Sequence, residues 1–201
     1  RPILQIGYPR NDILIRDNNK EEINKYKKLL GLPLDKKIIL YAPTWRDNEY
    51  LGEGKYKFAS KLDFDLAREQ LSDDYIFIVK YHYLVSDKID WRPYKGFVYT
   101  FDETKDIAWL YLVSDMLITD YSSVMFDYSL LKRPMFFFAY DLEDYRENLR
   151  GFYFDFAKEA PGPISKDTKQ LIEVIKEYDT SLWTEKNEAY RQKFNHIDDG
   201  H

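Results

Sequence analysis

Short runs of consecutive apolar residues recur along this chain, and apolar residues at helical spacing follow most of them. Runs of this length, bounded by turn residues, are typical of strands that are buried on both faces. The alternation returns about every thirty residues, which predicts strands joined by helical crossovers in one parallel sheet. The expected fold class is therefore α/β, a Rossmann-like doubly wound parallel sheet. The runs that predict its strands are residues 38–41, 75–79, 97–99, 116–118 and 135–139.

The first long helical segment illustrates the second half of this pattern. Asn19 is a favourable N-cap residue and Gly31 a favourable helix end, so a helix is expected between them. Apolar residues inside this segment return every three or four positions and predict its buried stripe. The stripe consists of Ile23, Tyr26, Leu29 and Leu30.

The pattern changes after residue 140. A charged helix is expected at 141–149, an alternating segment that forms an edge strand or a wall at 150–156, a rigid turn at 160–163 and two helices beyond it. We therefore expect one domain over residues 1–201, in which residues 141–201 form a C-terminal helical extension. The chain starts inside a predicted strand without an initiating Met, which predicts a fragment of a longer protein.

The stretch that joins the run 116–118 to the following helix carries the clearest candidate chemistry. Ser122 and Ser123 occupy the corner, and open α/β sheets bind ligands beyond the carboxyl ends of their strands. A helix start presents backbone N–H groups to a phosphate, and serine hydroxyls can add to them. Asp127 follows one turn later, about 6 Å along the same face, where a carboxylate can hold a ribose hydroxyl. The alternative is that Ser122 only caps the helix and Asp127 is solvated.

The end of the run 38–41 is a second candidate position. Pro43 stops the strand, because proline has no N–H for a sheet hydrogen bond, and Thr44 and Arg46 follow it. Arg46 is a candidate phosphate ligand. Its alternative role is an exposed ion pair with Asp47, a common and weak interaction.

Three further polar residues follow predicted strands. Lys80 and His82 come after the run 75–79, and Arg10 comes after the short predicted strand 3–6. A histidine at a strand end can donate to a phosphate oxygen or protonate a leaving phosphate, although a lone histidine is more often structural. Lys80 likewise has either a functional or a structural role.

Composition narrows the classes of function. The hydrophobic fraction of 44% is enough for a core, and the net charge of −5 gives no reason to expect nucleic-acid binding. Cysteine is absent, and no run approaches the roughly 18 apolar residues of a membrane span. The phosphate-binding loop of P-loop nucleotidases, the glycine fingerprint of dinucleotide folds and any Cys/His metal spacing are also absent from the sequence. No metal or other cofactor is expected.

Seven stretches form an ordered set along the chain: Gly7-Tyr8-Pro9-Arg10-Asn11-Asp12, Tyr41-Ala42-Pro43-Thr44-Trp45-Arg46-Asp47, Lys80-Tyr81-His82, residues 106–112, residues 118–127, Lys132-Arg133-Pro134 and Arg150-Gly151-Phe152-Tyr153-Phe154-Asp155. Together they resemble the CDP-glycerol glycerophosphotransferase family, the bacterial teichoic-acid polymerases and primases. The resemblance runs over nearly the whole chain, and it is far more specific than any one stretch.

The resemblance implies the C-terminal, nucleotide-binding half of a GT-B architecture, with an acceptor domain upstream of this chain. It implies transfer of glycerol phosphate or ribitol phosphate from CDP-glycerol or CDP-ribitol to a lipid-linked polyol phosphate acceptor, with release of CMP. The expected location is peripheral, on the cytoplasmic side of the cell membrane, which the full-length protein would contact.

The resemblance also implies roles for the candidate residues. His82 is expected at the donor's pyrophosphate, where it would assist the departure of CMP, and a second histidine upstream of residue 1 would act on the acceptor. Ser122 and Ser123 are expected to hold phosphate, and Asp127 a ribose or alditol hydroxyl. Pro43 and Thr44 are expected to line the cytidine pocket. Arg10 and Arg46 are weaker candidates for binding the substrate, and Lys80 is a further substrate-binding candidate.

Two other functions remain open at this point. A GT-B nucleotide-sugar glycosyltransferase has the same strand-end chemistry and differs in its donor. A non-catalytic nucleotide-binding or interaction domain has the same doubly wound sheet. A receiver-like domain is disfavoured, because it needs acidic residues clustered at one strand end and a lysine at another.

Overall fold

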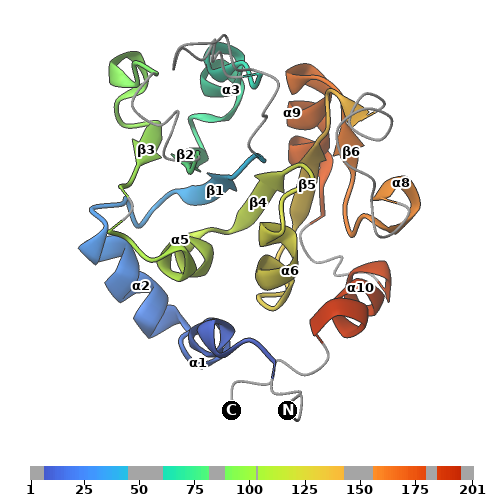
Figure 1. Cartoon of the computed structure of the whole chain (residues 1–201). Coiled ribbons are helices and arrows are strands. Elements are labelled where there is room, and N and C mark those ends of the chain that lie inside the picture. The colour runs from blue at the N-terminus through green and yellow to red at the C-terminus, as the bar shows by residue number, and fades with distance from the viewer. Residues whose placement is uncertain are drawn as a thin grey trace, which may run out of the picture.

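The computed structural model describes residues 7–44, 61–81, 89–102, 104–142, 156–179 and 185–195. The strands in these ranges form one six-stranded parallel sheet in the order β3-β2-β1-β4-β5-β6 (Figure 1). This order reverses between β1 and β4, as in doubly wound folds of the Rossmann type, so the predicted fold class is confirmed. The strands are β1 (Lys37–Tyr41), β2 (Tyr75–Val79), β3 (Val98–Thr100), β4 (Met116–Thr119), β5 (Met135–Phe138) and β6 (Ile164–Ser165).

Helices cover both faces of the sheet (Figure 1). One face carries α1 (Asp12–Arg16), α2 (Lys20–Leu29), α5 (Ile107–Val113), α6 (Val124–Ser129) and α10 (Glu185–Asn195). The opposite face carries α3 (Phe64–Leu71) and α9 (Thr168–Glu177). The remaining short helical elements are η1 (Pro9–Asn11), η3 (Arg92–Tyr94) and α8 (Phe156–Glu159).

The strands supply two hydrophobic cores, one on each face. Ile38 and Leu40 of β1 enter the core beside α2 and α5, whereas Ile39 and Tyr41 enter the core beside α3 and α9. Successive side chains of a strand point to opposite faces, so a run that is apolar at every position is buried on both. All four of these side chains are at most 3% exposed, which accounts for the unbroken apolar runs.

The predicted buried stripe of α2 is wrong at Leu29, and Ile23 is only half-buried. Leu29 is 61% exposed, whereas Tyr26 and Leu30 are buried as expected. Lys27 takes the buried place instead, with its ammonium group 4.0 Å from the Asp115 carboxylate. A lysine can bury its aliphatic stem while its charge stays at the rim, so the sequence pattern alone does not reveal this choice. The predicted cap is correct, because the Asn19 side chain accepts the Glu22 N–H.

The last third of the chain contributes to the sheet as well as to the helices. β6 pairs with β5, and α9 packs in the same core as α3, so residues 164–177 extend both the sheet and its cover. The predicted edge strand at 150–156 is wrong at Phe156, which begins α8, and residues 150–155 lie outside the described ranges. Most of the predicted helix 141–149 also lies outside them.

Gly162 makes the β5–β6 pairing possible. A Cβ atom at this position would lie 1.8 Å from the carbonyl oxygen of Met135, which is a backbone atom of the neighbouring strand. The turn that enters β6 therefore passes against β5 at a distance that only glycine permits.

Arg133 stabilises the end of α5. Its guanidinium donates to the carbonyl oxygens of Leu112, at 2.7 Å, and of Tyr111 and Ser114, and it also donates to Asn18 Oδ1 at 2.7 Å. The last carbonyl groups of a helix have no intrahelical partner, and a cation is favourable beside them. The Lys132-Arg133-Pro134 stretch thus has a structural function in this domain.

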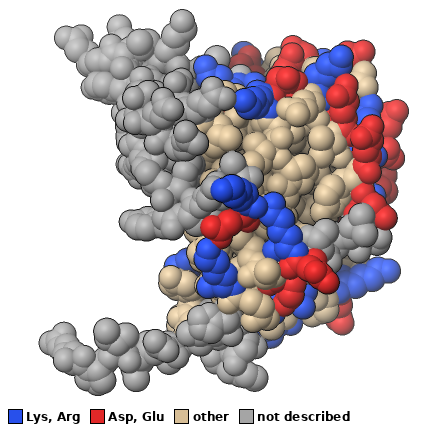
Figure 2. Space-filling view, turned by 90° about the vertical axis from the view of Figure 1, so that its right-hand side faces the viewer, with Lys and Arg blue, Asp and Glu red and all other residues tan. Residues whose placement is uncertain are grey.

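The described surface carries charges of both signs. On the face that Figure 2 shows, Lys and Arg side chains are interspersed with Asp and Glu around a broad uncharged area. Among the helices of the described ranges, none combines the length and the apolar character that a bilayer crossing requires.

Candidate nucleotide-binding site

The register of the parallel strands brings several predicted residues to one edge of the sheet. Tyr41 at the end of β1 pairs with Val79 of β2 and with Ile118 of β4, so the segments that leave these strands start side by side. Thr44, Lys80 and Ser122 all follow within a few residues of those strand ends. This is the carboxyl edge beside the order reversal, where doubly wound folds bind ligands.

A buried carboxylate joins two of these segments. Asp120, which follows β4 and is 2% exposed, accepts three hydrogen bonds at Oδ1. Thr44 donates two of them, from its backbone N–H at 2.8 Å and from its hydroxyl at 2.6 Å. The Tyr121 N–H donates the third at 2.6 Å. The segment after β1 is therefore tied directly to the corner after β4.

The main chain holds the same two strand ends together just before this point. The Ala42 N–H donates to the Ile118 carbonyl at 3.0 Å, and the Thr119 hydroxyl donates to the Ala42 carbonyl at 2.7 Å. Thr119 is fully buried. The corner is also tied to the loop after β5, because the Tyr121 hydroxyl donates to the Asp141 carboxylate at 3.1 Å.

Both predicted serines lie at the start of α6, and neither caps it through its side chain. Ser123 is the N-cap residue, with φ −61° and ψ −12°, and its hydroxyl makes no capping hydrogen bond. A side-chain cap usually requires extended backbone at that residue, which explains the difference from the expected cap. Ser122 is half-buried and Ser123 is exposed, and the structure gives their hydroxyls no hydrogen-bond partner within the described ranges. Within the described ranges, no bond inside the protein uses these two hydroxyls.

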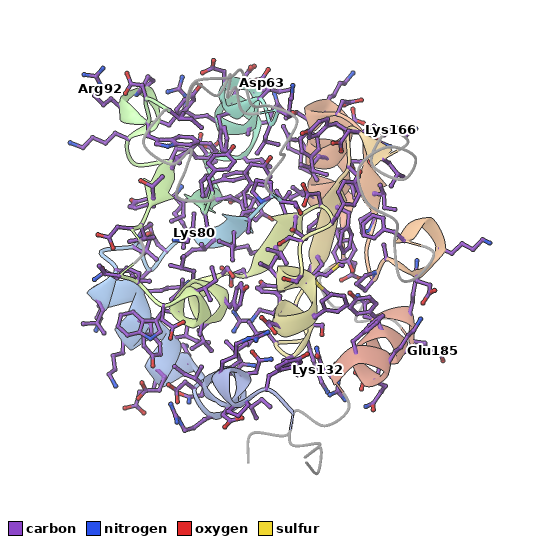
Figure 3. The ribbon with its side chains drawn as sticks, in the orientation of Figure 1. Asp63, Lys80, Arg92, Lys132, Lys166 and Glu185 are labelled. Carbon is purple, nitrogen blue, oxygen red and sulfur yellow. The ribbon has the colours of Figure 1, made fainter. Side chains whose placement is uncertain are left out.

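Lys80 contributes positive charge to this edge. It directly follows β2, and its backbone N–H donates to the Tyr41 carbonyl at 2.9 Å, which fixes its place beside the end of β1. Figure 3 shows Lys80 close to the strands, whereas the labelled Arg92 and Glu185 lie at the periphery. The Lys80 charge is one of the smaller causes that lower the pKa of Asp102, after the hydrogen bonds from Thr104 and the charge of Lys105. Asp102, after β3, is therefore within electrostatic range of the Lys80 charge.

Arg10 and Asp127 are paired with each other. The Arg10 guanidinium lies 3.1 Å from Asp127 Oδ1 and stacks 4.5 Å above the Tyr8 ring, and Asn11 Nδ2 donates to the same carboxylate oxygen at 3.0 Å. The hydrogen bond to Asp127 raises the pKa of Arg10. The Arg10 side chain is 64% exposed and that of Asp127 is 14% exposed. The carboxylate of the pair is therefore largely buried beside α6, and the guanidinium faces solvent.

Two predicted residues, His82 and Arg46, lie outside the described ranges. Pro43, by contrast, lies at the strand edge directly before Thr44. Within the described residues, no three His, Cys, Asp or Glu side chains come together in a way that could hold a metal ion.

Sequence reasoning missed Asp120, Asn11 and Tyr121 as contributors to this edge. The sequence signal of Asp120 is its place directly after a buried strand and before the serines, but its partner Thr44 is 76 positions away. No local pattern identifies that partner.

Comparison with known proteins gives a family for this arrangement. A family model described as CDP-Glycerol:Poly(glycerophosphate) glycerophosphotransferase matches residues 1–201. The teichoic acid poly(glycerol phosphate) polymerase of Bacillus subtilis (strain 168) is 54% identical over 177 residues, which are 88% of this chain and 24% of the polymerase.

Solved structures agree with this match. The wall teichoic acid polymerase TagF has a TM-score of 0.90 at 45% identity, covering 98% of this chain and 49% of the TagF chain. A TagF variant soaked with CDPG has a TM-score of 0.89 at 44% identity with the same coverage. The chain thus spans about half the length of the solved polymerase and about a quarter of the Bacillus subtilis one.

Proposed function

Because the chain belongs to the CDP-glycerol:poly(glycerophosphate) glycerophosphotransferase family, we propose that it is the nucleotide-binding domain of a teichoic-acid glycerophosphotransferase. In this proposal the enzyme transfers glycerol phosphate from CDP-glycerol to a hydroxyl of a lipid-linked polyol phosphate and releases CMP. The observation that supports it best is the joined strand edge at Thr44, Asp120 and Ser122, at the place where this fold binds ligands.

The reaction is a displacement at phosphorus. The acceptor hydroxyl oxygen forms a bond to the phosphorus that carries glycerol, the bond from that phosphorus to the bridging oxygen breaks, and CMP leaves with the electron pair. The hydroxyl proton would pass to a base, and the expected base is a histidine upstream of residue 1. Such reactions depend mainly on alignment of the phosphoryl group and on neutralisation of its charge.

The described residues suit the binding part of this task. The hydroxyls of the half-buried Ser122 and the exposed Ser123 would donate to phosphate oxygens, and Lys80 would neutralise phosphate charge. Pro43 and Thr44 would line the cytidine pocket. His82 would contact the pyrophosphate and assist the departure of CMP, and Arg46 would add a phosphate contact.

Asp127 and Arg10 would serve the same ligand as a pair. Their mutual hydrogen bonds hold the guanidinium at the side of α6. The exposed cation would attract the diphosphate, and the Asp127 carboxylate would accept from an alditol or ribose hydroxyl. The whole enzyme would work on the cytoplasmic side of the membrane, with a second domain that supplies the acceptor site.

Binding measurements test the donor class. Calorimetry of the chain with CDP-glycerol, CDP-ribitol, CDP and a UDP-sugar should show CDP-alditols binding more tightly than the UDP-sugar. Tighter binding of the UDP-sugar would replace this proposal by a nucleotide-sugar glycosyltransferase. Tighter binding of CDP-ribitol would keep the reaction and change the alditol.

Serine variants test the site. Ser123→Ala and Ser122→Ala should each weaken CDP-glycerol binding by about 10- to 100-fold, because hydrogen bonds to charged groups contribute roughly 1.5–3 kcal/mol. Ser72→Ala is the matched control, since Ser72 ends α3 and precedes β2, at the opposite edge of the sheet. Equal binding by all three variants, together with full activity of His82→Ala in the full-length protein, would contradict the proposed site.

A further inference from the structure

The Asp120 carboxylate is buried at the candidate site, and the proposed binding roles do not use it. A charge that is 2% exposed is costly unless hydrogen bonds replace its lost hydration. Here three donors converge on Oδ1, all within 2.8 Å. These donors come from two segments that are far apart in the sequence and adjacent in space. The carboxylate is thus a fixed link between them.

The sheet does not need this link in order to join β1 to β4. The strands pair from Ile39 to Tyr41, and the Ala42 N–H and the Thr119 hydroxyl extend the connection beyond the ladder. Pro43 then breaks the ladder, because it has no N–H. Thr44 provides the first backbone donor after the proline, and this donor goes to Asp120. Asp120 therefore determines the direction of the chain after the strands have ended.

The same carboxylate determines the corner that leads to the serines. The Tyr121 N–H donates to it at 2.6 Å, and Ser122 and Ser123 follow directly. The Thr44 hydroxyl hydrogen is also committed to Asp120, at 2.6 Å. An ionised carboxylate only accepts, so this hydroxyl is the donor and its rotation is fixed.

We propose that Asp120 is a positioning residue, which sets the placement of the Pro43-Thr44 segment relative to Ser122 and Ser123. It thereby aligns the donor, with its cytidine at the Pro43-Thr44 segment and its diphosphate at the serines. This inference rests on the proposed function. In this proposal Asp120 acts through Thr44 and Tyr121, whose donors it holds, and its role needs no contact with the substrate. In-line displacement tolerates little misplacement, and a displacement of about 1 Å can cost about 100-fold in rate.

Asp115 offers a matched control at the other end of the same strand. Its carboxylate precedes β4 and accepts the Ile38 N–H at 2.7 Å, so it also ties β4 to β1. It lies at the amino edge of the sheet, opposite the candidate site. Asp115→Asn and Asp120→Asn thus weaken the same kind of cross-strand link at opposite edges, because each replaces a charged acceptor by a neutral amide oxygen.

Steady-state kinetics of the full-length protein with CDP-glycerol compare the two variants. Asp120→Asn should lower kcat about 10-fold and Asp120→Ala about 100-fold, while KM for CDP-glycerol rises less than kcat falls. Asp115→Asn should keep both constants within about 2-fold of the wild type. Equal effects of Asp120→Asn and Asp115→Asn on kcat would overturn the inference.

A double-mutant cycle separates the coupling between Thr44 and Asp120 from a general loss of stability. Thr44→Val should lower kcat and Thr44→Ser should restore most of it. Thr44→Val combined with Asp120→Asn should cost clearly less than the sum of the two single changes, because both weaken the same link between Thr44 and Asp120. Additive losses would contradict the inference even if Asp120→Ala fails to fold. Failure of the proposed function gives a different result, since the wild-type protein itself would then bind no CDP-glycerol.

Discussion

Arg10 and Asp127 are 117 positions apart and form an ion pair, in which the guanidinium Nη2 lies 3.1 Å from Oδ1 and 3.3 Å from Oδ2. Both were predicted from the sequence as ligands of a substrate, and in the structure each is the partner of the other. A bound diphosphate would meet a cation whose orientation is already fixed. Pre-orientation of this kind lowers the entropic cost of binding.

Removing Arg10 should therefore affect binding more than stability. The Arg10 side chain is 64% exposed, and exposed ion pairs contribute roughly 0–1 kcal/mol. Arg10→Ala should change the free energy of unfolding in urea by less than about 1 kcal/mol and weaken CDP-glycerol binding about 10-fold by calorimetry. Arg16→Ala is the control, since Arg16 also pairs with an aspartate, Asp17, on a different helix. Unchanged binding by the Arg10 variant would remove Arg10 from the site.

Removing Arg133 should lower stability and leave CDP-glycerol binding unchanged, the opposite of the result expected for Arg10. Its guanidinium serves three carbonyl oxygens at the end of α5 and the Asn18 side chain, so Arg133→Ala leaves those groups without their donor. We expect a loss of about 2 kcal/mol in the free energy of unfolding and unchanged CDP-glycerol affinity. Arg92→Ala, at an arginine on the periphery in Figure 3, should leave stability unchanged. Weaker binding without a stability loss would assign Arg133 to the site instead.

Gly162→Ala should disrupt the edge of the sheet. The added Cβ would lie 1.8 Å from the Met135 carbonyl oxygen, and a backbone atom of a paired strand cannot move aside cheaply. A loss of about 3 kcal/mol or more is expected, because overpacking of this severity is at the upper end of measured costs. Gly31→Ala is the contrast: the space around it is open, and its φ of +66° predicts a loss of only about 1 kcal/mol. Comparable losses for both variants in urea unfolding would refute the close approach.

The hydrogen bond from Tyr26 to Asp17 predicts a pH dependence of stability. This bond, of 2.7 Å, and burial raise the pKa of Tyr26 to about 12, whereas the bond from Arg16 lowers the pKa of Asp17. The contribution of Tyr26 is complete below pH 10, the ordinary tyrosine pKa, and is lost as the pH rises toward 12. That of Asp17 is present above its ordinary pKa of about 3.9 and is lost as the pH falls below it.

Tyr26→Phe isolates the alkaline part of this dependence. The difference in unfolding free energy between the wild type and Tyr26→Phe should be constant from pH 6 to about 9.5 and should shrink above pH 10. Urea unfolding at each pH measures this difference, and the other tyrosines with raised pKa values are the same in both proteins. A difference that grows above pH 10 would show that the bond does not hold Tyr26 in its neutral form.

The strands of this protein were predictable because their signal is local. A strand between two layers of helices must be apolar at every position, as in Ile38–Leu40 and Phe136–Phe138, and no partner needs to be known. Helix caps are local as well: Asn19 accepts from the N–H of Glu22, only three residues away. The ordered set of motifs extended this local information to the family.

Contacts across the sheet were not predictable in the same way. β6 was missed because a strand of two residues, after the turn at Gly162, leaves almost no periodic pattern. Leu29 was predicted as buried, since the spacing permits either Leu29 or Lys27 to face the core, and only the packing against α5 selects between them.

The sequence by itself determined the fold class, the family and the edge of the sheet on which the candidate residues stand, because strand ends and the residues after them are adjacent in the chain. Only the tertiary structure decided that Thr44 donates to Asp120 and that Arg10 pairs with Asp127. Those partners are 76 and 117 positions apart in the sequence. They meet because β1 lies beside β4 in the sheet and because η1, which carries Arg10, lies against α6. Local propensity carries no information about which distant residues become neighbours, because the order of the strands in the sheet decides that.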